Sequence, residues 1–273
     1  VERQPGGVVT ASPRVVQRRL VRPHVHQDVL FVELLPHVDH VAEVGERFGA
    51  LCLAGLADLG GQREYEALKA LLARLDMPVY MIPGNHDNRE RMVEIFGDSH
   101  AYLPRNGGLL NYTIEDHPLR IIALDSLIDG EVCGIVDADQ REWLDAELSK
   151  APDRPTIVML HHPPVHTGVP WLVMFGLREA KEFGEVIGRH PQILRVFLSG
   201  HDHRPIQSLW HGTLAITAPS TAHQFFLTFD PKSPGHWGME PPACLVHKWF
   251  GADNGGLITH TSYIGDYGPH EDF

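Results

Sequence analysis

Short apolar runs alternate with amphipathic stretches from about residue 60 onward. Residues 78–82 and 119–124 are nearly continuous apolar runs, as in buried strands, whereas residues 65–75 carry apolar side chains at helical spacing. The order repeats over residues 156–198, where two apolar runs flank another helical stretch. Strands interleaved with helices predict an α/β fold, α+β by some schemes.

The last third of the chain changes character. Runs typical of strands are joined by Gly and Pro turns at residues 214–217, 225–229, 244–250 and 257–264. This pattern favours a second sheet packed on the first. We therefore predict a single domain over residues 1–273, with an atypical segment at 1–55 and a strand-rich extension from about 222 to 273.

Composition limits the classes of function. The chain has 273 residues, 43% hydrophobic and 21% charged, which is ordinary for a soluble globular protein. Its net charge of -12 argues against binding a nucleic-acid polymer or an anionic membrane, because such binding depends on clustered Lys and Arg. Widely spaced cysteines, and the absence of an apolar run of roughly 18 residues or of a signal-peptide pattern, favour a cytoplasmic protein.

Three short motifs place metal-capable side chains at predicted strand ends. They are Gly-Asn-His-Asp at residues 84–87, His-His-Pro-Pro at 161–164 and Gly-His-Asp-His at 200–203. Asn carbonyl oxygens and neutral imidazole nitrogens are ligands for borderline divalent metals. Loops far apart in sequence reach one spot only if the fold brings strand ends together, so the motifs predict one shared metal site.

Individual residues within the motifs have distinct predicted roles. His201 and His203, at i and i+2 of an extended segment, point to the same side and can both reach metal. Asn85 can bind metal through its amide oxygen, and His86, held by Asp87, can donate a proton or hydrogen bond to a phosphoryl oxygen or leaving group. Each motif taken alone also fits a polar turn.

The second motif completes a pattern known from one family. His161 follows an apolar strand, and His162 is interpreted as its non-ligating neighbour. In this order the three motifs resemble the calcineurin-like metallophosphoesterases, in particular their branch of cyclic-nucleotide and glycerophosphodiester phosphodiesterases. The resemblance runs from about Leu53 to the C-terminus. It implies a two-sheet β-sandwich flanked by helices, and proteins of this branch often form homo-oligomers.

The resemblance also implies a binuclear centre of two divalent ions, such as Fe, Mn, Zn or Co. The metal ligands that it implies are Asn85, His161, His201 and His203. It further implies that His86 assists at the phosphate, and that His223, in a segment similar to one near the substrate pocket, binds substrate together with His86. The implied reaction is hydrolysis of a small phosphodiester, either a cyclic nucleotide such as 3',5'-cyclic AMP or a glycerophosphodiester, by a metal-bound hydroxide.

Two ligand motifs of the family are missing where they are expected. The first family strand ends in Asp-x-His, but Arg18-Arg19-Leu20 stands between the matching flanks, and residues 53–60 match the second motif with its bridging Asp deleted. Two cations roughly 3.5–4 Å apart repel each other, and no carboxylate between them offsets this repulsion. Asp58 is the nearest substitute bridging ligand if its loop shifts. Other candidates are His24, His26, Asp28 and Asp39.

Other interpretations stay open. If the bridging Asp is truly absent, the chain can be a metal-depleted, non-catalytic relative that binds a phosphate ligand or a partner. Residues 24–28 also match most of a metallo-β-lactamase metal motif, but Val29 replaces its last His, and residues 84–87 are then unexplained. A local reading-frame error in the gene is a further hypothesis, because residues 1–55 match the family only in fragments.

Overall fold

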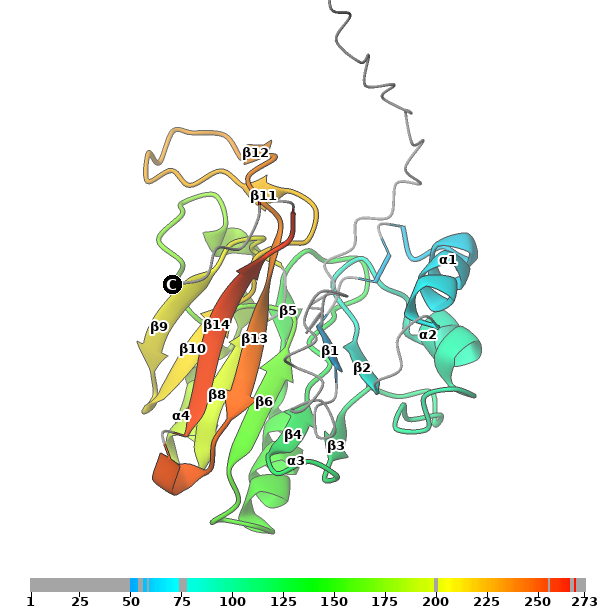
Figure 1. The fold of residues 1–273 in the computed structure, drawn as a ribbon, viewed down its shortest axis with the longest axis vertical. Helices are drawn as coiled ribbons and strands as arrows, with labels where there is room; N and C mark the ends of the chain where they lie inside the picture. The colour runs from blue at the N-terminus through cyan, green and yellow to red at the C-terminus, as the bar shows by residue number, and fades with distance from the viewer. Residues whose placement is uncertain are drawn as a thin grey trace, which may run out of the picture.

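The computed structural model describes residues 50–53, 56–57, 59–73, 78–198, 201–254, 256–265 and 268. A six-stranded sheet forms the centre of the fold (Figure 1). Its strands, in spatial order, are β3 (Tyr112–Ile114), β4 (Arg120–Ala123), β6 (Thr156–Leu160), β8 (Ile193–Leu198), β10 (Thr213–Thr217) and β9 (Ile206–Trp210). The four inner strands are parallel and the two edge strands antiparallel, so four strands end at the same edge of the sheet.

Two strand pairs form a second layer. β1 (Ala50–Leu53) pairs parallel with β2 (Val79–Ile82), and β13 (Ala243–Trp249) pairs antiparallel with β14 (Leu257–Tyr263). In Figure 1, β13 and β14 cross in front of β8 and β10. One buried cluster joins the layers and includes Met81, Met159 and Leu245, from β2, β6 and β13. This arrangement confirms the predicted two-sheet sandwich.

Helices cover both outer faces. α1 (Gln62–Leu72) and α2 (Arg89–Phe96) pack with β2 in the first buried cluster. α3 (Ala138–Ser149) and α4 (Ala180–Gly188) pack against the six-stranded sheet in a second cluster. Neighbouring residues of the inner strands point to opposite faces, so β4 and β6 each supply side chains to both clusters.

Shorter elements connect these layers. They are β5 (Gly134–Ile135), η2 (Val173–Phe175), β7 (Leu177–Arg178), β11 (Gln224–Phe225), β12 (Trp237–Gly238) and η3 (Ala252–Asn254). β5 pairs with β7, and β11 pairs with β12 as a hairpin above the sheet edge (Figure 1). No helix among the described residues is long and apolar enough to cross a membrane.

Candidate metal centre

Three loops bring predicted metal ligands together at the carboxyl ends of strands. Asn85 follows β2, His161 follows β6 and His201 follows β8. The Nε2 atom of His161 lies 3.1 Å from the Oδ1 atom of Asn85 and 3.1 Å from the Nδ1 atom of His201. One imidazole nitrogen carries at most one proton, whereas a divalent cation accepts the lone pairs of all three atoms. This donor set therefore fits a metal ion.

The electrostatic environment favours neutral imidazoles. Burial lowers the pKa of His161 well below its ordinary value, and repulsion from the neighbouring histidines lowers it further. The same two causes lower the pKa of His201 to about 3. Both rings are therefore neutral near pH 7 and offer lone pairs to a metal ion.

His203 lies within electrostatic range of the same ligands, because a charge on it lowers the pKa of both His161 and His201. Its backbone has φ 46°, in the left-handed region, so the alternation of an extended strand does not continue through this residue. Its Nδ1 atom donates to the carbonyl of His223 at 3.2 Å, which leaves Nε2 as the lone-pair nitrogen.

The first motif forms a turn that presents two residues. His86 is exposed, and a charge on it lowers the pKa of His161 and His201, so it lies near the ligands at the surface of the site. Asp87 is buried and holds the turn, because its carboxylate accepts hydrogen bonds from the Gly84 amide at 2.8 Å and the Tyr65 hydroxyl at 2.8 Å.

The hydrogen bonds of Asp87 differ from the expectation that it holds the His86 side chain. A third donor to its carboxylate is the Leu56 amide, at 2.9 Å, and the Tyr65 hydroxyl in turn accepts from the Asn88 amide at 2.8 Å. Among the described residues, no hydrogen bond joins Asp87 to His86. Asp87 therefore fixes the backbone that carries Asn85 and His86, rather than the imidazole ring.

His162 brings a third imidazole to the cluster, although the sequence predicts it to be a non-ligating neighbour of His161. The ligand atoms of His161, His162 and His201 all lie within 4.8 Å of one another. The Nδ1 atom of His162 is 2.8 Å from the Ser126 hydroxyl, and a Cβ atom on Gly134 would come within 2.2 Å of it. β6 ends at Leu160. His161 and His162 therefore do not point to opposite faces of the sheet, as they would in a continued strand.

Among the described residues, no carboxylate belongs to this group of potential ligands. Asp58 and the N-terminal candidates His24, His26, Asp28 and Asp39 lie outside the described residues. Asp202, inside the third motif, is fully buried, and neither carboxylate oxygen has a hydrogen-bond partner in the part of the chain that the structure describes. Burial raises its pKa to about 7. A cation held by the adjacent histidines would supply the positive charge that this buried group lacks.

His223 lies beside His203. The ring centroids of His203 and His223 are 4.5 Å apart, and the His223 ring is partly exposed. This position, beside one candidate metal ligand and open to solvent, suits contact with a substrate.

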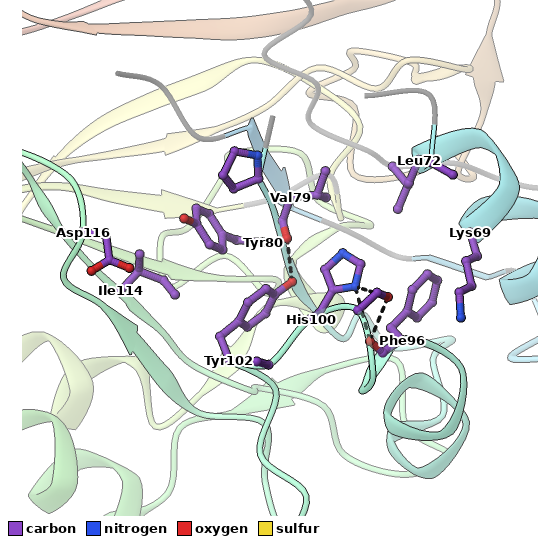
Figure 2. A pocket seen from close by; sticks show the side chains of 13 residues that line it. Lys69, Leu72, Val79, Tyr80, Phe96, His100, Tyr102, Ile114 and Asp116 are labelled. Atoms are coloured by element: carbon purple, nitrogen blue, oxygen red, sulfur yellow. Dashed lines mark hydrogen bonds between the residues drawn. The ribbon is translucent and has the colours of Figure 1, made fainter. Parts of the chain in front are cut away.

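A separate cavity of about 480 Å³ lies at the other end of β2 (Figure 2). Its lining includes Val79 and Tyr80, at the start of that strand, and His100 and Tyr102. Asn85 follows the opposite end of β2. The cavity is therefore not part of the metal centre.

Comparison with known proteins identifies the family of this chain. The family model described as calcineurin-like phosphoesterase matches residues 34–205. A probable glycerophosphodiester phosphodiesterase, GpdQ, of Arcobacter nitrofigilis is 36% identical over 217 residues, which cover 79% of this chain and 78% of that protein. A probable cyclic nucleotide phosphodiesterase of Synechococcus is 39% identical over 68% of this chain and 69% of its own length.

A third relative is more distant. The 3',5'-cyclic adenosine monophosphate phosphodiesterase CpdA of Escherichia coli is 28% identical over 81% of this chain and 72% of its own length. The family match covers more than half of the chain, and the relatives cover most of it. The chain belongs to the calcineurin-like phosphoesterase family.

Proposed function

We propose that this chain is an enzyme that hydrolyses small phosphodiesters with the help of bound divalent metal ions. The observation that carries the proposal is the convergence of the Asn85 oxygen with the His161 and His201 nitrogens, in a member of a phosphoesterase family. Relatives that match most of the chain are named for glycerophosphodiesters and for cyclic nucleotides. Both substrate classes are therefore proposed here.

The distances among Asn85, His161 and His201 support the proposal that these three residues would hold one divalent ion. His203 is proposed, from the family resemblance, as a ligand of a second ion. Such ions, proposed to be Fe, Mn, Zn or Co, supply Lewis-acid stabilisation of the charge on phosphoryl oxygens. Asp58 remains the proposed bridging ligand, although it lies outside the described residues.

The proposed substrate contacts come from two exposed or half-exposed histidines. His86 stands at the surface of the ligand cluster and donates a hydrogen bond to a phosphoryl or leaving-group oxygen. His223 lies beside His203 and binds another part of the diester. Asp87 acts indirectly, by holding the turn that carries His86.

The test combines metal content with turnover. Purified protein is loaded with manganese, and hydrolysis of 3',5'-cyclic AMP, bis(p-nitrophenyl) phosphate and glycerophosphoethanolamine is measured. We expect turnover of at least one diester, its loss in the His161→Ala variant, and full activity in His260→Ala, which removes an exposed histidine of β14. No turnover of any diester by metal-loaded wild-type protein would reject the proposal.

One observation favours the non-catalytic alternative. Among the described residues, the cluster of potential metal ligands consists of histidines, with no carboxylate. A chain with this cluster alone is proposed, as the alternative, to bind a phosphate ligand or a partner without hydrolysis. Elemental analysis distinguishes the two, because two metal equivalents favour the enzyme and none or one favours the binding protein.

The remaining features of the proposal concern the whole protein. We propose a single domain, a cytoplasmic location and homo-oligomer formation. The wide spacing of the cysteines in the sequence fits a reducing compartment. The net charge of -12 supports a small substrate rather than a nucleic-acid polymer.

A further inference from the structure

Two aromatic side chains of one hairpin contact the histidines His203 and His223. In the β11–β12 hairpin, Phe225 pairs directly with Trp237, and residues opposite each other in an antiparallel pair project from the same face. The Phe225 ring stacks on the His203 ring, with centroids 4.5 Å apart and planes 12° from parallel. The Trp237 ring lies 5.2 Å from the His223 ring. This face of the hairpin therefore borders both histidines.

The two rings are held differently. Phe225 is enclosed between His203 and Trp171, whose ring centroid lies 4.9 Å away at 78°, and it is partly buried. It therefore serves to orient His203. Trp237 is 65% exposed although it borders the site, so most of its indole surface is available to another planar group.

Further exposed apolar side chains occur in segments near Trp237 in the chain or in contact with the hairpin. They are Phe226, Leu227 and Phe229 of the hairpin loop, Met239 just after β12, and Val173 and Met174 of η2. The hairpin loop and the η2 segment are in contact, because the hairpin-loop residue Gly235 packs against the Trp171 ring. Clustered exposed apolar groups beside a polar site indicate a ligand with an apolar portion.

We infer that Trp237 is a specificity residue that stacks on a planar ring carried by one ester group of the substrate. The inference rests on the proposed function and narrows its substrate class to diesters that carry a nucleobase or an aryl group. A glycerophosphodiester offers no such ring. Base stacking on one aromatic side chain changes affinity by about tenfold or more.

The kinetic test compares the two substrate classes in one variant. For Trp237→Ala we expect KM for 3',5'-cyclic AMP to rise about tenfold, while kcat/KM for glycerophosphoethanolamine stays within about twofold. Trp237→Phe keeps a ring and should restore most of the affinity for cyclic AMP. Lys232→Ala, in the same exposed loop, is the control and should leave the kinetics with both substrates unchanged.

A binding test keeps the inference separate from the proposed function. Calorimetry with 5'-AMP and ribose 5-phosphate requires no turnover, and the two ligands differ by the base. We expect wild-type protein to bind 5'-AMP at least about tenfold more tightly, and Trp237→Ala to remove the difference. Equal affinity of wild-type protein for both ligands would overturn the inference. An equal fall in kcat/KM for both substrates in Trp237→Ala would also overturn it. Absence of all hydrolysis with the 5'-AMP preference intact would reject only the proposed function.

Discussion

The Nε2 atom of His161 lies 3.1 Å from the Nδ1 atom of His201, and both rings are buried. Burial lowers the pKa of each ring, so neither carries a charge near neutral pH. The Asn85 oxygen completes the contact, again at 3.1 Å from His161. These three atoms with lone pairs lie close together. A metal ion can bind all three of them, whereas a single proton cannot.

Removal of His161 should abolish tight metal binding. His161→Ala deletes the atom that contacts both other ligands, so we expect metal affinity to fall by at least about 100-fold, since even outer hydrogen-bond partners of ligands cost about 10–100-fold. Titration calorimetry with Mn²⁺ measures this loss. Unchanged affinity would show that the metal binds elsewhere, and His260→Ala controls for loss of an exposed histidine.

The Tyr65 hydroxyl should stabilise the turn that carries Asn85. Tyr65→Phe removes one donor to the buried Asp87 carboxylate and the acceptor of the Asn88 amide. We expect a loss of about 1–3 kcal/mol in the free energy of unfolding, because buried polar groups lose their partners. Urea unfolding measures it, with Ser149→Ala, which removes an exposed hydroxyl of α3, as the control. A loss no larger than that of the control would show that the Tyr65 hydroxyl does not stabilise the turn.

Gly134 should be required for the position of His162. A Cβ atom there would lie 2.2 Å from the His162 Nδ1 atom and 2.6 Å from the Ser126 carbonyl oxygen. Gly134→Ala should therefore destabilise the fold by about 1–3 kcal/mol or more, as overpacking does. Gly238→Ala is the matched control, because nothing lies within 4 Å of its added Cβ. Equal thermal stability of the two variants would contradict the packing described.

His117 should contribute to the pH dependence of stability. Burial lowers its pKa below the ordinary 6.5, and its Nε2 atom is 2.8 Å from the Tyr80 hydroxyl. As the pH falls, His117 takes up its proton at a higher pH in the unfolded chain than in the folded protein. The stabilisation from neutral His117 is therefore complete above pH 6.5 and is lost as the pH falls below that value. Urea midpoints at several pH values should fall less steeply in His117→Gln. Parallel curves would exclude this role.

The strands around the site could be predicted from sequence because their apolar runs are continuous. β6 begins and β8 ends where the expected stretch of residues 156–198 begins and ends. The expected strand at 225–229 was wrong beyond Phe225, because residues 226–229 form no strand and most are exposed. Hydrophobicity there belongs to a surface beside the site rather than to the core, and a pattern alone does not distinguish the two.

The grouping of Asn85, His161 and His201 could also be predicted, because each follows a strand end. The place of His162 and the hydrogen bond from Tyr65 to Asp87 could not. His162 and Asp87 both follow strand ends, beyond which the two-residue period no longer gives the side-chain direction.

Metal-dependent catalysis is tested by measuring hydrolysis of 3',5'-cyclic AMP before chelation, after chelation and after manganese is restored. We expect release of 5'-AMP that disappears with the metal, returns with manganese, and does not return in His161→Ala. Metal-loaded wild-type protein that releases no 5'-AMP, and that also leaves bis(p-nitrophenyl) phosphate and glycerophosphoethanolamine intact, would contradict the proposed function.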